Sequence, residues 1–148
     1  MVMVGGPVSG SDSGFVAQQF AGEGDPLEGL AGKHVLLAED EAVLSIEIEL
    51  ALEDAGAVVV GPIARLHDGL ALAATAPLAI DAAILDIDLQ GEDVYPLADV
   101  LCEQGIPFVF HTGHGSRQEL KERFDSAPVC LKPAMTDEIL RSVARLLD

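Results

Sequence analysis

Five polar side chains in this sequence directly follow short apolar runs, and their types suit one kind of chemistry. Three are carboxylates, one is a hydroxyl and one is an amine: Glu39, Asp40, Asp86, Thr112 and Lys132. Carboxylates brought within about 4 Å repel one another by roughly 4 kcal/mol per pair at an effective dielectric near 20, so clustering them requires a cation. Lys132 supplies one cation, and Mg²⁺, which prefers oxygen ligands, supplies another.

Phosphoryl transfer is the reaction that this set of groups favours. In such a site Asp86 can attack a phosphoryl donor in line and form an aspartyl phosphate. Thr112 and Lys132 would contact the oxygens of the transferred group, which provides positioning and charge neutralisation. Each residue also has a structural alternative. Glu39 and Asp40 can cap a following helix, and Asp86 can be a turn residue after a strand. Thr112 can bond its own backbone, and Lys132 can be an ordinary exposed lysine.

These residues must be brought to one edge of a sheet, and the order of the apolar runs predicts how. From Lys33 onward, short apolar runs alternate with segments of helical period, which is typical of repeated βα units. Ligands of such sheets bind beyond the carboxyl ends of the strands. Strands are predicted at residues 34–38, 57–61, 79–86, 106–111 and 127–131. Helices are predicted at 41–55, 66–74, 93–104, 115–125 and 136–147.

The predicted fold class is α/β, a doubly wound, flavodoxin-like five-stranded parallel sheet with helices on both faces. Right-handed crossovers give the strand order 2-1-3-4-5 most simply. In helix 41–55, Val43, Ile46 and Leu50 recur at helical spacing between acidic residues, so we predict an amphipathic helix with these three on its apolar side. Thr136 is the predicted N-cap of the last helix.

Composition narrows the class of protein. The 148 residues fit one domain, and 25 acidic against 8 basic residues, a net charge of −17, argue against a nucleic-acid partner. No apolar run approaches the roughly 18 to 20 residues of a membrane span, and the first residues lack the features of a signal peptide. We therefore expect no membrane association and a cytoplasmic location. Cys102 and Cys130 lack metal-ligand spacing and are predicted to be buried, reduced thiols.

The chain divides into a tail and a domain. Residues 1–32 contain 8 of the 15 glycines and no basic side chain, and they show no lasting periodicity. This composition predicts a flexible N-terminal tail ahead of a domain at 33–148.

Four motifs, in order along the predicted domain, resemble the receiver domain of bacterial two-component response regulators. They are the acidic pair in VLLAEDE, the phosphoacceptor strand and loop AAILDIDLQGE, the hydroxyl motif FHTGHG and the Lys-Pro motif CLKPA. The resemblance implies that Asp86 is both phosphoacceptor and Mg²⁺ ligand. It further implies that Asp40 binds the ion directly, Glu39 through water, and Asp88 through its backbone carbonyl.

Within that family the sequence is similar to the single-domain "FAT GUY" subgroup, with three departures. His111 replaces Ala, His114 replaces Tyr and Ala134 replaces the usual Phe. No zinc-ligand spacing surrounds the two histidines, so a hydrogen-bonded ring is favoured over metal ligation for both. The resemblance also implies a cis peptide bond between Lys132 and Pro133.

Other positions implied by the resemblance concern phosphate lifetime and output. Asp88, Gly113 and His114 flank the reacting groups and are predicted modulators of aspartyl-phosphate lifetime. Val129 occupies a position that is aromatic in most receivers. We therefore expect no aromatic rotamer switch there, and we expect the 112–126 loop and helix to report phosphorylation.

The function implied is that of a stand-alone receiver. It would take a phosphoryl group from a sensor histidine kinase or a histidine phosphotransfer protein, and act on an unidentified downstream protein as a switch or as a phosphate sink. It would catalyse only its own phosphorylation and dephosphorylation. Five of the eight basic residues lie in the last two predicted helices, namely Arg117, Lys121, Arg123, Arg141 and Arg145. They favour a solvated face over a partner surface, and either is compatible with homodimer contacts.

Two other functions compete with this one. LDIDLQG also resembles the first motif of haloacid-dehalogenase-type phosphatases, in which Asp86 would be the nucleophile and Asp88 the acid/base. Against this, that motif normally opens the chain, and no acidic metal pair ends a later strand. A pseudo-receiver that binds partners without phosphorylation is the other alternative, and the intact acceptor, hydroxyl and lysine argue against it.

Overall fold

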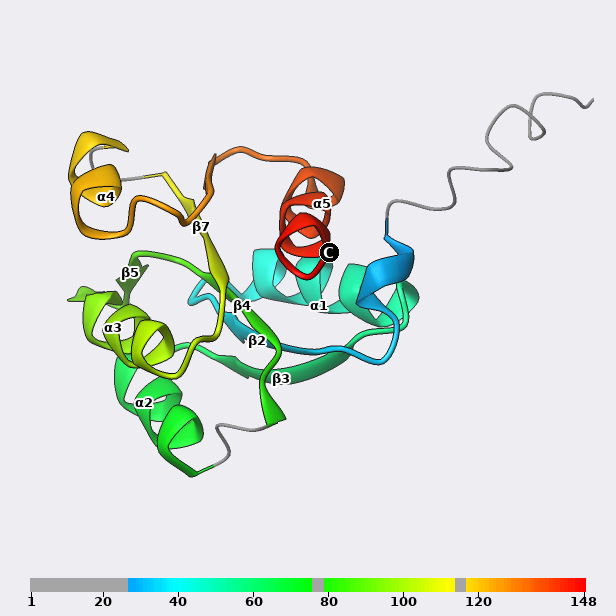
Figure 1. Cartoon of the computed structure of the whole chain (residues 1–148), viewed down its shortest axis with the longest axis horizontal. Helices are drawn as coiled ribbons and strands as arrows, with labels where there is room; N and C mark the ends of the chain where they lie inside the picture. The colour runs from blue at the N-terminus through cyan, green and yellow to red at the C-terminus, as the bar shows by residue number, and fades with distance from the viewer. Residues whose placement is uncertain (1–26, 76–78, 114–116) are drawn as a thin grey trace, which may run out of the picture.

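A five-stranded parallel sheet forms the centre of the computed structural model, which describes residues 27–75, 79–113 and 117–148. Its strand order is β3-β2-β4-β7-β8 (Figure 1), which is the predicted order of second, first, third, fourth and fifth strand along the chain. The strands are β2 (His34–Ala38), β3 (Val58–Ile63), β4 (Ala82–Leu85), β7 (Phe108–Thr112) and β8 (Val129–Leu131).

Helices cover both faces of this sheet, as predicted (Figure 1). One face carries α1 (Ala42–Asp54), α5 (Thr136–Leu146) and the 3₁₀ turn η3 (Glu28–Leu30). The other face carries α2 (Leu66–Thr75), α3 (Tyr95–Glu103) and α4 (Arg117–Arg123).

Alternating strand residues divide the core into two clusters, one on each face of the sheet. Leu85 and Phe110 belong to the cluster under α2, α3 and α4, whereas their neighbours Ile84 and Val109 belong to the cluster under α1 and α5. Successive side chains of a strand point to opposite faces, so a central strand covered on both sides must be apolar throughout. This explains why the predicted strands are continuous apolar runs rather than alternating ones.

An antiparallel hairpin between β4 and α3 was not predicted. It pairs β5 (Asp88–Leu89) with β6 (Glu92–Asp93). Its two turn residues, Gln90 and Gly91, both have positive φ, at 55° and 90°. Two-residue hairpins favour turns of this kind, but strands of two residues leave no periodicity to detect.

The domain begins earlier than the predicted boundary at residue 33. Leu30 is completely buried in the cluster under α1 and α5, and the amide of Gly32 donates to the carbonyl of Gly56 at 2.8 Å. The apolar side chains of Leu27 and Leu30 account for this docking, because they cover the cluster at that end. Residues 1–26 of the predicted tail lie outside the described residues.

Helix α1 buries a different side from the one predicted. Val43, Ile46 and Leu50 are 73%, 54% and 60% exposed, while Ser45, Ile48 and Leu52 are buried. Both sets have the spacing i, i+3, i+7, so helical periodicity alone cannot choose between them. The side facing the sheet is chosen by how the chain leaves β2.

Two local predictions were also wrong. Met135, not Thr136, occupies the N-cap of α5, and its amide donates to the carboxylate of Glu138 at 3.4 Å. Cys102 is exposed and Cys130 only half-buried, although both are free thiols as expected. In the described part of the chain, no helix has the length and apolar character needed to cross a membrane.

Candidate functional site

Backbone hydrogen bonds continue past the strand ends and hold the predicted site residues at one edge of the sheet. The amide of Asp86 donates to the carbonyl of Ala38 at 2.9 Å, and the amide of Lys132 donates to that of Thr112 at 2.9 Å. These residues are therefore fixed by the sheet ladder even though they lie beyond or at the ends of the strands.

Glu39, Asp40 and Asp86 form a compact acidic cluster at this edge. One carboxylate oxygen from each lies within 4.8 Å of the others, and Glu39 and Asp86 are buried. A set of carboxylate oxygens without nitrogen or sulphur suits Mg²⁺ among the common metal ions. The three residues present therefore fit the metal predicted from the sequence.

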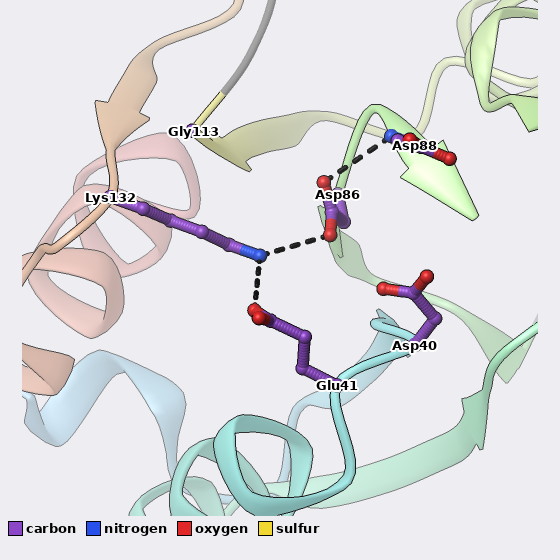
Figure 2. A pocket seen from close by; sticks show the side chains of 6 residues that line it. All are labelled: Asp40, Glu41, Asp86, Asp88, Gly113 and Lys132. Carbon is purple, nitrogen blue, oxygen red and sulfur yellow. Dashed lines mark hydrogen bonds and ion pairs between the residues drawn. The ribbon is translucent and has the colours of Figure 1, made fainter. Parts of the chain in front are cut away.

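Lys132 reaches across from the end of β8 and binds three carboxylates. Its Nζ lies 2.8 Å from Glu41 Oε1, 3.0 Å from Asp86 Oδ2 and 3.3 Å from Glu39 Oε2. Figure 2 shows the amine between Asp86 and Glu41. Lys132 thus compensates part of the negative charge that the cluster concentrates.

The pKa values of this network reflect its burial. Burial, followed by the nearby charge of Asp86, raises the pKa of Glu39 to about 7, against the hydrogen bond from the Glu41 amide and the charge of Lys132. Burial alone would lower the pKa of Lys132, but hydrogen bonds to Glu41 and Asp86 outweigh it and raise that pKa. Glu39 therefore holds a proton in the metal-free protein more tightly than an ordinary glutamate does.

Glu41 was quoted within a motif but not predicted as a site residue. Its carboxylate makes the shortest of the three contacts to Lys132, and it lines the same cavity. Its position two residues after Glu39, at the start of α1, was the available signal. Sequence alone did not show that its side chain turns back towards the end of β8.

The β5–β6 hairpin positions Asp40. The amide of Gln90 donates to Asp40 Oδ2 at 2.9 Å, a contact between residues far apart in the sequence. Gln90 is one of the two turn residues of the hairpin, so the turn itself is fastened to Asp40. The hairpin therefore fixes the carboxylate of one predicted metal ligand.

Asp88 lies at the rim of the cavity with its side chain engaged locally. Its Oδ1 accepts from the amide of Gly91 at 2.6 Å, and its own amide donates to Asp86 Oδ1 at 3.3 Å. The cavity has a volume of about 200 Å³ and is lined by Asp40, Glu41, Asp86, Asp88, Gly113 and Lys132 (Figure 2). The cavity gives solvent and small ligands access to Asp86.

The remaining predicted residues that the structure describes lie at the ends of β7 and β8 or directly after them. Thr112 ends β7 and is completely buried, and Gly113 follows it against the side chain of Lys132. The Lys132–Pro133 peptide bond is cis. His114 lies outside the described residues.

His111 departs from the expected hydrogen-bonded ring. It is 1% exposed, and neither ring nitrogen has a hydrogen-bond partner. Its Nδ1 lies 3.9 Å from Glu39 Oε1, too far for a hydrogen bond. Burial, then the charge of Lys132, lowers the pKa of His111, which favours the neutral ring.

Comparisons by sequence and by structure give different results. No protein-family model matches the chain, and no curated protein matches it. Solved structures, in contrast, do match the chain. A response regulator receiver protein from Sinorhizobium medicae is 29% identical with a TM-score of 0.69, covering 78% of this chain and 94% of that one.

Two further structures are more distant in sequence. The response regulator PhyR from Brucella abortus is 22% identical with a TM-score of 0.68, and the match covers 82% of this chain and 50% of that chain. A CheX–CheY–BeF₃–Mg²⁺ complex from Borrelia burgdorferi matches with 16% identity and a TM-score of 0.73, covering 84% and 99%. This chain thus spans about half the length of PhyR and nearly all of the other two.

Proposed function

We propose that this chain, whose structure fits a response-regulator receiver domain, accepts a phosphoryl group on Asp86 in a Mg²⁺-dependent reaction. One observation carries the proposal: Glu39, Asp40 and Lys132 converge on Asp86 at the edge of an accessible cavity. The Borrelia neighbour in complex with BeF₃ and Mg²⁺ supports the choice of ion and of chemistry.

The residues divide the work of the reaction. A carboxylate oxygen of Asp86 attacks phosphorus while the bond from phosphorus to the donor breaks and its electron pair leaves with the donor. Glu39, Asp40 and Asp86 would hold Mg²⁺, which neutralises charge on the phosphoryl oxygens when bound. Lys132 would move from its carboxylate partners to the new phosphoryl group, and Thr112 would donate to another phosphoryl oxygen.

The donor is a sensor histidine kinase or a histidine phosphotransfer protein, and α1 is the surface that suits it. Val43, Ile46 and Leu50 expose an apolar stripe that begins two residues after Glu41, at the cavity. The helix carries four acidic residues and no basic one, so a complementary partner presents an apolar patch with a basic rim.

The consequence of phosphorylation is a change of partner or removal of phosphate from the pathway. Val129 on β8 offers no aromatic switch, so residues 112–126 are the proposed reporting element. The stand-alone arrangement, homodimer contacts and cytoplasmic location stay predictions.

No observation favours the haloacid-dehalogenase-like alternative. That mechanism needs the Asp88 side chain as acid/base, whereas Asp88 Oδ1 is held by the amide of Gly91. The solved structures described above are receivers and their assemblies.

Intact mass spectrometry tests the proposal directly. After incubation with acetyl phosphate and Mg²⁺, one added phosphoryl group is expected, and none after chelation with EDTA. Asp86→Asn should abolish the adduct, whereas the matched control Asp88→Asn should keep it. An adduct that survives in Asp86→Asn, or absence of any adduct in the unmodified protein, would overturn the proposal.

A further inference from the structure

In the described part of the chain, the buried side-chain atoms that lack a hydrogen-bond partner belong to His111. Both of its ring nitrogens lack a hydrogen-bond partner. A buried donor without a partner costs about 1–3 kcal/mol, so such a residue calls for an explanation. The proposed reaction assigns His111 no part.

Glu39 offers the nearest carboxylate to this ring. His111 Nδ1 and Glu39 Oε1 are 3.9 Å apart, and both side chains are 1% exposed. The other oxygen, Oε2, already accepts from the amide of Glu41 at 3.1 Å and from Lys132 at 3.3 Å. Oε1 is therefore the oxygen of Glu39 that faces the histidine, and an approach of about 1 Å would make a hydrogen bond.

The tautomer of a neutral His111 ring follows from this arrangement. A neutral imidazole has one N–H donor and one acceptor nitrogen. A proton on Nδ1 directs the donor at Glu39 Oε1. When Glu39 is ionised, a proton on Nε2 would instead direct the Nδ1 lone pair at a carboxylate oxygen, which is repulsive.

From this geometry we infer that His111 carries its proton on Nδ1 and, on the closer approach just described, orients the ionised Glu39 by donating to Oε1, which strengthens Mg²⁺ binding at the site. The inference deepens the proposed function and rests on it. Residues that orient metal-binding carboxylates from outside the set of ligands typically change metal affinity by about 10- to 100-fold when they are lost.

Direct metal ligation by His111 does not fit the same geometry. The donor atoms of Glu39, Asp40 and Asp86 lie within 4.8 Å of one another, and the histidine ring is not part of that group. His111 instead lies on the β7 side of Glu39, one residue before Thr112. It therefore acts on the metal through Glu39.

Three substitutions at one position separate orientation from packing. In His111→Asn the side-chain amide nitrogen can occupy nearly the place of Nδ1, so the donor is kept. His111→Gln places its amide near Nε2, and His111→Leu keeps comparable volume without a donor. By isothermal titration calorimetry with Mg²⁺, we expect Asn to bind nearly as tightly as the unmodified protein, and Gln and Leu about tenfold or more weakly.

The tautomer itself supplies a second measurement that needs no metal. Nitrogen-15 NMR of the metal-free protein, at a pH well above the pKa of about 7 of Glu39 so that its carboxylate is ionised, should show His111 protonated on Nδ1. An Nε2 proton, or equal Mg²⁺ affinities for the Asn and Leu variants, would overturn the inference. If Leu fails to fold, Gln serves in its place. Absence of Mg²⁺ binding by the unmodified protein would instead count against the proposed function, while the tautomer still tests His111.

Discussion

Two successive rows of residues on one sheet face are buried alike but differ in chemistry. The apolar row, paired in register across β2, β4 and β7, consists of Leu37, Ile84 and Val109. The polar row lies two residues further along the same chain segments and consists of Glu39, Asp86 and His111. Exposure is 0–1% in the first row and 1–4% in the second.

The difference shows which buried residues lower the stability of the fold and which raise it. Burial of the apolar row is favourable, because apolar surface leaves water. Burial of the polar row is unfavourable unless charge is compensated, and the raised pKa of Glu39 reflects this. Stability should therefore depend on Mg²⁺ and pH through the polar row and not through the apolar one.

The largest loss of stability is expected in the apolar row. Ile84→Ala removes a side chain that is 1% exposed and leaves a cavity in the cluster under α1 and α5. A change of this kind costs about 2–5 kcal/mol. Urea unfolding with and without Mg²⁺ should give the same loss, because the cavity touches no metal ligand. A loss that depends on Mg²⁺ would contradict the separation of the two rows.

Lys132→Met should cost about 3 kcal/mol in EDTA at neutral pH, because it leaves three carboxylates without their cation. Mg²⁺ should reduce this difference in unfolding free energy between the variant and the unmodified protein, since the ion replaces the missing charge. Ile84→Ala is the control, because its loss of unfolding free energy should be the same with and without Mg²⁺. Equal differences with and without Mg²⁺ for both variants would show that Lys132 does not balance the site's charge.

The third effect concerns pH. Glu39 has a pKa of about 7 in the folded protein and 4.5 as its reference value, so folding stabilises its protonated form. This contribution is complete below pH 4.5 and is lost as pH rises through 7. In EDTA, the stability of the unmodified protein relative to Glu39→Gln should fall by up to about 3 kcal/mol between pH 4.5 and 7.5.

Urea unfolding of both proteins at each pH isolates Glu39, because the other titrating groups are shared. Mg²⁺ should reduce this decline, since a cation favours the ionised carboxylate. A difference in stability that does not change with pH would mean that Glu39 titrates normally.

Much of the fold and of the site could be predicted from sequence because both rest on the same local signal. A polar residue directly after a buried strand must lie at the carboxyl edge of the sheet, which brought Glu39, Asp40 and Asp86 together correctly. Continuous apolar runs separated by helical segments likewise predicted the strand order.

What escaped prediction depends on side-chain direction and on the orientation of elements. The contact between Glu41 and Lys132 and the position of His111 beside Glu39 join residues more than 70 positions apart, and no spacing encodes them. In α1, two residue sets share one period, and only the packed structure shows that Ile48 rather than Ile46 is buried.

A substitution on the exposed side of α1 should change the stability least. Ile46→Ser is expected to alter unfolding free energy by no more than about 0.5 kcal/mol, as surface substitutions usually do. Yet phosphoryl transfer from a histidine-containing protein donor should slow, because the donor's docking patch is lost. Transfer from acetyl phosphate should be unchanged, since a small donor reaches the cavity without touching α1.

Val58→Ser is the matched control for the two rates of phosphoryl transfer, from the protein donor and from acetyl phosphate. Val58 is also apolar and exposed, but it lies at the start of β3 at the opposite edge of the sheet from the cavity. Equal slowing by both variants would show that α1 is not the docking surface, and slowing with acetyl phosphate would show that Ile46→Ser disturbs the site itself. A loss confined to Ile46→Ser and to the protein donor would separate the recognition surface from the polar row that does the chemistry.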